Sequence, residues 1–327
     1  MNNDTTVSYP TGDTNVIEPE DKWPVHILLL FSLAITLFYV NFSAPGIGWR
    51  DGPEFSVSSV FLDVSHPSGF PAYNLIAKIM TWIPLGAIGF RVTAFTALMG
   101  GLSIFVFAVL LKNLHRLSDG ENEPAHWFLF APLLLYALDK AIFASSTEPE
   151  VYSLNTFFIL VLLLFALKWF TGNGIAWLYS GAFVYGLSAG NHAAVGLYLP
   201  VLLLLTVWGE PRNETPDKTG LAIRGKRIAT LALFFLIGFS VYFLLLVRSQ
   251  TDRLPIDFGR TDTWERFWRH LTDAKDSETH FQGIRKLEDL GHILPLQIKN
   301  LFSPLFWFSV PFFAWGLKWL WKNYQIL

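Results

Sequence analysis

Residues 49–73 read WRDGPEFSVSSVFLDVSHPSGFPAY and bring polar chemistry directly after an apolar run. We expect Asp51 and Glu54 to lie at a membrane surface, where an ionisable side chain is a candidate functional group. Their spacing of three residues places both carboxylates on one side of a helix or tight turn, able to share a hydroxyl, a metal ion or a proton. The HPSGFP turn that begins at His66 holds two prolines and a glycine, which predicts a stiff loop that presents its polar groups.

The composition of the whole chain predicts an integral membrane protein. Of its 327 residues, 52% are hydrophobic, 16% aromatic and only 15% charged. The net charge of -2 offers no basic face, which excludes nucleic acid as a partner. The absence of cysteine excludes disulfides, thiolate metal sites and a cysteine nucleophile. Residues 1–22 are polar and acidic and lack the basic start of a signal peptide, so they predict a disordered tail before a retained helix.

Apolar runs then predict an all-α polytopic bundle of about eight transmembrane helices within one domain, residues 23–327. Runs of about twenty residues match the length needed to cross a hydrocarbon core of roughly 30 Å. The predicted spans are 25–44, 91–111, 127–145, 151–170, 175–190, 193–208, 228–247 and 301–320. The pair Gly100 and Gly101 predicts a close helix contact, for which simple packing is the favoured explanation.

Two shorter helices are predicted to lie in the membrane interface, one in each of the long polar loops. In the first outer loop, residues 45–90, the segment 71–85 is too short and too broken to cross. In the last outer loop, residues 248–300, the sequence TDTWERFWRHL predicts an amphipathic helix that begins at the cap residue Thr263. Its predicted aromatic face consists of Trp264, Phe267 and Trp268.

The span order predicts that the separated polar sites share one side of the membrane. With the N-terminus inside and 71–85 not crossing, Asp51, Glu150, His192 and Arg248 all fall on the outer side. The same order puts the basic loop 209–227 inside, as the positive-inside rule favours, whereas the basic residues of 248–300 oppose it. If 71–85 crossed the membrane, Asp51 would face away from the other sites.

Five motifs occur in order along the chain, and together they resemble one enzyme family. They are Asp-x-x-Glu at 51–54, HPSGFP at 66–71, EVYSL at 150–154, GNH at 190–192, and Arg248 ahead of the WERF helix. This order is similar to the membrane glycosyltransferases that are bacterial homologues of the vertebrate protein O-mannosyltransferase acting on plexin-type domains. The resemblance covers residues 49–272. It implies a GT-C type bundle in the bacterial inner membrane, with a catalytic acid in the first outer loop and an active site that faces outward.

Residue by residue, the resemblance implies that Asp51 is the catalytic acid and Glu54 its partner. The sequence here is DGPE where DSGE is usual in the family, and Ser68 replaces a usual proline in the turn. The residues implied to bind substrate are His66, Glu150, Tyr152, Asn191, His192 and Arg248. Relatives usually continue with further helices and often a soluble tail, so this chain is expected to be a C-terminally truncated fragment or a minimal form.

The predicted reaction moves a sugar, mannose by resemblance, from a polyprenyl-phosphate donor to a hydroxyl of a protein or lipid acceptor. Such a transfer needs a base for the hydroxyl, a cation for the leaving phosphate and an apolar groove for the lipid. Asp51 would be the base or a carboxylate that orients the substrate, and Glu54 would hold the acceptor or a divalent cation. Arg248 and His192 would bind the phosphate, for which arginine is well suited. Attack opposite the phosphate inverts the anomeric centre. No cofactor or metal ligand is assigned, and a divalent cation stays open.

Each of these residues also has a plainer interpretation. Asp51 and Glu54 are then solvated loop acids, His66 a turn residue, and Glu150 an acid in a helix first turn, which the helix dipole favours. The hairpin tip at 191–192 becomes a pair of caps, and Arg248 an interfacial anchor. A lipid or small-solute transporter is the second functional hypothesis, although no convincing internal repeat is present. A non-catalytic scaffold is the third, and it predicts that the acids and Arg248 are replaceable.

Overall fold

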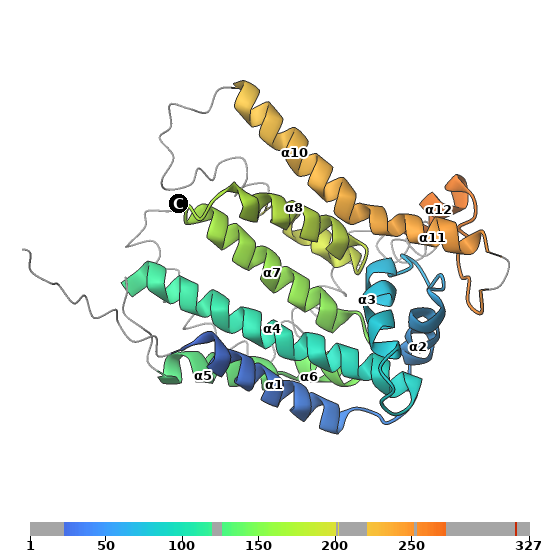
Figure 1. Cartoon of the computed structure of the whole chain (residues 1–327), viewed down its shortest axis with the longest axis horizontal. Coiled ribbons are helices and arrows are strands. Elements are labelled where there is room, and N and C mark those ends of the chain that lie inside the picture. Colours follow the sequence, from blue (N-terminus) through green and yellow to red (C-terminus); the bar gives the residue numbers. More distant parts are fainter. Residues whose placement is uncertain are drawn as a thin grey trace, which may run out of the picture. The chain divides into compact units, whose positions relative to one another are not determined.

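The computed structural model describes residues 23–119, 126–200, 202, 221–251, 254–272 and 318 (Figure 1). The chain divides into two compact units, Met1–His270 and Leu271–Leu327, and the following concerns the first. The described helices are α1 Val25–Phe42, α2 Gly52–Phe61, α3 Pro71–Thr81, α4 Ile88–Asp119, α5 His126–Leu138, α6 Lys140–Thr147, α7 Tyr152–Phe170, α8 Ile175–Ala189, η1 Ala193–Tyr198, α10 Leu221–Phe239, η3 Ser240–Tyr242, α11 Phe243–Ser249 and α12 Trp264–Leu271. The predicted tail 1–22 and the predicted span 301–320 lie outside the described part of the chain, apart from residue 318.

The described helices confirm an all-α, multi-pass membrane protein. Four stretches are long and apolar enough to cross a bilayer, namely Val25–Phe42, Ile88–Arg116, Tyr152–Phe170 and Gly225–Ser249. A fifth crossing results if the bent pair α5 and α6 counts as one span. The predicted run 193–208 begins instead with the 3-10 helix η1, and most of its remainder is not described. The described residues therefore show four or five of the eight predicted spans.

The predicted span 127–145 is broken at Asp139, where α5 and α6 meet at an angle of 60°. Asp139 Oδ1 accepts hydrogen bonds from Ala141 N at 2.9 Å and Ile142 N at 3.3 Å, so its side chain caps the start of α6. The break frees the Ala137 carbonyl, which accepts a hydrogen bond from Tyr39 Oη of α1 at 2.8 Å. Backbone groups at membrane depth must find such partners inside the protein. The capping carboxylate therefore explains the bend.

Helix α4 lies between α1, α6 and α7 and makes close contacts through its glycine pair (Figure 1). A Cβ atom on Gly101 would lie 1.9 Å from Thr36 Oγ1 of α1, and one on Gly100 would lie 2.3 Å from Ser146 Oγ of α6. In the structure the close approach of α1 and α4 lets Ser32 Oγ donate a hydrogen bond to the Gly101 carbonyl at 2.7 Å. The close approach predicted at these glycines is confirmed, and helix packing accounts for it.

The short helices α2 and α3 pack against each other and against α4, grouped at one end of the long helices (Figure 1). Helix α3 has 11 residues and is too short to cross a bilayer, as predicted. After α2 the chain pairs with a distant loop, because Val64 N donates to Ile256 O at 3.2 Å and Phe258 N donates to Val64 O at 3.1 Å. These two hydrogen bonds tie the loop that leads to His66 to the segment 256–258.

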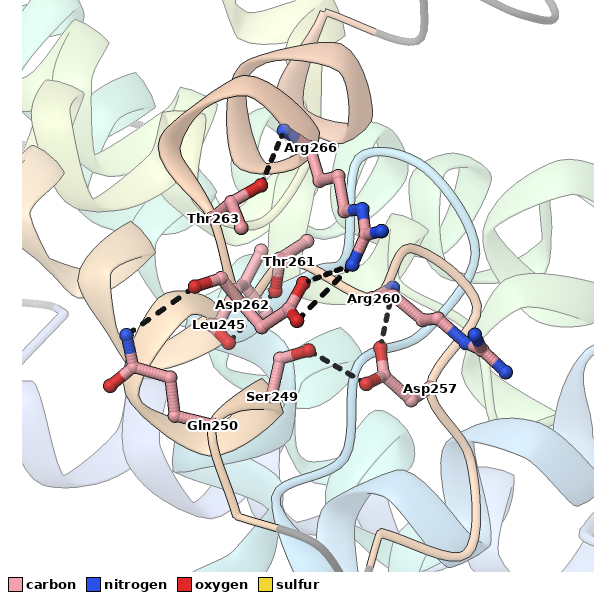
Figure 2. A network of polar contacts seen from close by, with 9 residues as sticks. All are labelled: Leu245, Ser249, Gln250, Asp257, Arg260, Thr261, Asp262, Thr263 and Arg266. Carbon is pink, nitrogen blue, oxygen red and sulfur yellow. Dashed lines mark hydrogen bonds and ion pairs between the residues drawn. The ribbon is translucent and has the colours of Figure 1, made fainter.

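A polar network fixes the loop between α11 and α12 (Figure 2). Ser249 Oγ donates to Asp257 Oδ2 at 2.7 Å, and Thr261 Oγ1 donates to the Leu245 carbonyl at 2.9 Å. Thr263 Oγ1 accepts a hydrogen bond from Arg266 N at 3.4 Å, which confirms the predicted cap of α12. Phe267 of the aromatic face is buried, whereas Trp264 and Trp268 are exposed. Helix α12 is therefore amphipathic as predicted, and its position on a membrane surface stays a prediction.

Candidate active site

Glu54 and His66 form the best defined pair of the site. Glu54 lies in the first turn of α2, and its Oε1 accepts hydrogen bonds from His66 N at 2.8 Å and His66 Nδ1 at 2.9 Å. The two side chains are 14% and 34% exposed. The hydrogen bond that His66 donates to Glu54 raises the pKa of His66, and the charges of Asp51 and Glu150 add to this effect, whereas burial opposes it. Glu54 is thus committed to orienting the turn that begins at His66.

Asp51 lies beside this pair, and no hydrogen bond from the described residues engages its carboxylate. It occupies the N-cap position of α2 but makes no side-chain cap hydrogen bond. One ligand atom from each of Asp51, Glu54 and His66 can be chosen so that all three lie within 4.8 Å of one another. Two carboxylates and an imidazole are donors that could hold a divalent cation such as Mn²⁺. Asp51 is also placed to accept a proton from a hydroxyl brought to the site.

Glu150 reaches the same site from the segment that leads into α7. Pro149 packs against the start of α2, where a Cβ atom on Gly52 would lie 3.3 Å from Pro149 Cδ. Glu150 itself is 8% exposed. Burial, followed by the charges of Asp51 and Glu148, raises the pKa of Glu150 to about 7. A carboxyl with this pKa can hold or release a proton near neutral pH.

Aromatic rings form a second side of the site. The ring of Phe70 lies 4.8 Å from that of His66 and 6.3 Å from that of His192, measured between centroids. Tyr152 continues this wall with its ring 5.4 Å from His192. His192 Nδ1 accepts a hydrogen bond from Ala194 N at 3.0 Å, which places the ring proton on Nε2. Because burial also lowers the pKa of His192, the side chain is a neutral donor near pH 7 rather than a cation.

The structure places Asn191 and Arg248 in contact with backbone rather than with the acids. Asn191 is fully buried, and its Nδ2 donates to the Val151 carbonyl at 3.1 Å, which ties the end of α8 to the start of α7. Arg248 donates from Nε to Leu62 O at 3.2 Å and from Nη2 to Phe61 O at 2.8 Å. These carbonyls end α2, about 15 Å from Asp51 at a rise of 1.5 Å per residue. Phosphate binding by Arg248 stays a prediction, and apart from Asn191 the site gathers the other predicted residues without it.

Sequence reasoning missed Arg50 and Phe70 as neighbours of the site. The charge of Arg50 lowers the pKa of Glu150, so its guanidinium lies within electrostatic reach of that carboxylate. Its place in the sequence could have predicted this. Arg50 directly precedes Asp51 and therefore lies at the same end of the helix. Phe70 gave no comparable signal, because its contacts with His66 and His192 depend on the folded turn.

Comparison with known proteins places these residues in a family. The chain is 22% identical over 265 residues to protein O-mannosyl-transferase tmem260 of Dictyostelium discoideum, which covers 75% of this chain and 30% of that protein. It is 27% identical over 236 residues to protein O-mannosyl-transferase TMEM260 of Mus musculus, which covers 70% of this chain and 31% of that protein. The chain thus matches less than a third of the length of these relatives. No solved structure matches it.

The family model for the N-terminal domain of the protein O-mannosyl-transferase TMEM260 matches residues 51–215, which is half of the 327-residue chain. That stretch begins at Asp51 and contains Glu54, His66, Glu150 and His192. The chain therefore belongs to the TMEM260 family of protein O-mannosyl-transferases.

Proposed function

We propose that this chain is an inverting GT-C type glycosyltransferase that moves mannose from a polyprenyl-phosphate donor to a hydroxyl of a protein or lipid acceptor. The observation that carries the proposal is the meeting of Asp51, the Glu54–His66 pair and Glu150 at one end of the membrane spans. The two relatives above are named protein O-mannosyl-transferases. The proposed site opens on the outer side of the membrane, which is the inner membrane if the source is a bacterium.

In the proposed reaction the acceptor hydroxyl attacks the anomeric carbon of the donor sugar. Asp51 takes the hydroxyl proton while the bond from the anomeric carbon to the phosphate oxygen breaks. The products are the glycosylated acceptor, with inverted configuration, and the free polyprenyl phosphate. Asp51 suits the role of base because its carboxylate caps no backbone group, whereas Glu54 is engaged with His66.

The aromatic wall suits a sugar, since the apolar faces of pyranose rings pack on aromatic side chains. Phe70 and Tyr152 would supply such surfaces, and His192 Nε2 would donate a hydrogen bond to a sugar or phosphate oxygen. Asn191 would act indirectly, by holding the end of α8 that carries His192.

An apolar cavity supports a donor with a lipid tail. Its volume is about 390 Å³, and it lies between α7, α8 and α10, where Leu162, Trp177 and Phe235 contribute to its lining. Along α7, Leu162 is ten residues beyond Tyr152, or about 15 Å at 1.5 Å per residue. A chain of isoprene units could therefore occupy this cavity while its phosphate stays near the site.

The test is transfer of radiolabelled mannose from polyprenyl-phosphate mannose to acceptors in membranes that contain the full chain. We expect Asp51→Asn to lower the transfer rate about 10²- to 10⁴-fold, as loss of a general base does. Glu265→Gln in the exposed first turn of α12 is the control at matched expression and should transfer like wild type. Full activity in Asp51→Asn would remove Asp51 as the base. If the wild-type chain transfers no mannose, either the proposed donor or the proposed enzymatic activity is wrong.

A further inference from the structure

The candidate active site gathers more negative charge than its described cations offset. Asp51, Glu54 and Glu150 bring three carboxylates together, and Glu148 adds its charge to that of Glu150. The opposing groups that act on Glu150 are Arg50 and a protonated His66. Carboxylates brought this close repel one another unless a cation or a proton lies between them.

The distances within the cluster fit one metal ion. Ligand atoms of Asp51, Glu54 and His66 lie within 4.8 Å of one another. Ligands on opposite sides of a divalent cation are about 4 to 5 Å apart, because each lies about 2.0 to 2.6 Å from the ion. Three such atoms can thus reach a common centre with small side-chain movements. The two carboxylates suit Mn²⁺ and Mg²⁺, and the chain has no cysteine to supply the thiolate ligands that softer metals prefer.

Glu150 provides an independent indication of a cation. The residue is 8% exposed, and within the described part of the chain no hydrogen bond reaches its carboxylate. It interacts electrostatically with both Asp51 and His66, so it faces the cluster. A buried carboxylate without a hydrogen-bond donor is costly unless a positive charge lies nearby.

We propose that Asp51, Glu54 and His66 bind one divalent cation of the Mn²⁺ and Mg²⁺ class, with Glu150 beside it as a further carboxylate. The ion would replace the ring proton that now joins His66 Nδ1 to Glu54. It would also place a positive charge next to Asp51, where a leaving phosphate must be neutralised, whereas Arg248 is bonded to the carbonyls at the end of α2. That role in transfer rests on the proposed function, whereas binding of the ion does not.

The experiment is Mn²⁺ titration of the full chain, purified in detergent and stripped with EDTA, with free Mn²⁺ followed by electron paramagnetic resonance. We expect one Mn²⁺ per chain, displaced by Mg²⁺. Asp51→Asn and Glu54→Gln should each weaken binding tenfold or more, since loss of even a supporting partner costs 10- to 100-fold in affinity. Glu265→Gln should bind like wild type. We expect Asp51→Asn to fold like wild type, because Asp51 makes no cap hydrogen bond.

Two results would overturn the cation site: no Mn²⁺ binding at millimolar concentration, or a bound ion whose affinity both variants leave unchanged. Mannose transfer measured on the same preparations separates the two proposals. If Mn²⁺ binds through these residues but no mannose is transferred, the cation site stands and the proposed function fails. If transfer proceeds unchanged in EDTA and no ion binds, the function stands and the cation site is wrong.

Discussion

Asp63 provides a quantitative test of how the loop after α2 is held. Its side chain is 2% exposed, and Oδ2 accepts a single hydrogen bond, from Ile256 N at 3.1 Å. Oδ1 has no partner in the described part of the chain. Burial raises the pKa of Asp63 from 3.8 to about 6, although the hydrogen bond from Ile256 and the charge of Arg248 oppose that shift. The ionised carboxylate should therefore destabilise the fold.

The sign of this effect follows from the two pKa values. Between 3.8 and about 6 the folded chain holds the Asp63 proton more tightly than the unfolded chain, so the free energy of unfolding falls as the pH rises. At 1.36 kcal/mol per pKa unit, ionised Asp63 lowers the free energy of unfolding by about 3 kcal/mol once the pH is above about 6. Asp63→Asn removes the charge and keeps an oxygen for Ile256 N. We expect the variant to be up to about 3 kcal/mol more stable near neutral pH, with most of that gain lost near pH 4.

The assay is thermal unfolding in detergent, followed by tryptophan fluorescence at about pH 4, 6 and 7.5. Each kcal/mol corresponds to about 2–4 °C in Tm for a domain of this order of size. Asp262→Asn is the matched control, because the exposed Asp262 pairs with Arg266 at 2.8 Å, which lowers the pKa of Asp262 (Figure 2). That variant should gain nothing at neutral pH. An Asp63→Asn variant that melts below wild type at pH 7.5 would show that Arg248 stabilises the carboxylate more than burial costs it.

Two further substitutions test the packing of the spans. Gly186→Ala should lower stability by about 2 kcal/mol or more, because the new methyl group would lie 2.1 Å from Phe235 O. Gly196→Ala is the control, because a methyl group there would have no atom within 4 Å. Equal melting temperatures for the two variants would contradict the contact. Tyr39→Phe should cost about 1–3 kcal/mol by leaving the Ala137 carbonyl unpaired at the break after α5, and an unchanged melting curve would show that this carbonyl has another partner.

Apolar length predicted the described spans well because crossing a bilayer leaves few alternatives to a helix. The runs 25–44 and 151–170 are matched by α1 and α7 to within two residues at either end. The same reasoning could not find the break at Asp139, since hydropathy does not reveal a side chain that caps the backbone inside a run. It also predicted an α-helix from residue 193, where His192 caps a 3-10 helix instead.

The candidate site was predictable to the extent that its residues are fixed by local chain geometry. Asp51 is the N-cap of α2 and Glu54 lies in its first turn, so their spacing was enough to place them together. They meet His66 and Glu150 because of the turn at 66–71 and the packing of Pro149 on α2. The sequence shows the order of these motifs but does not predict their contacts. Arg248 shows the limit of that order. A guanidinium suits a phosphate and the carbonyl end of a helix equally well, and only the fold selects the end of α2 for it. If Arg248 keeps these contacts when the proposed donor binds, the donor phosphate needs another positive charge near Asp51, and either Arg50 or a bound cation would meet that need.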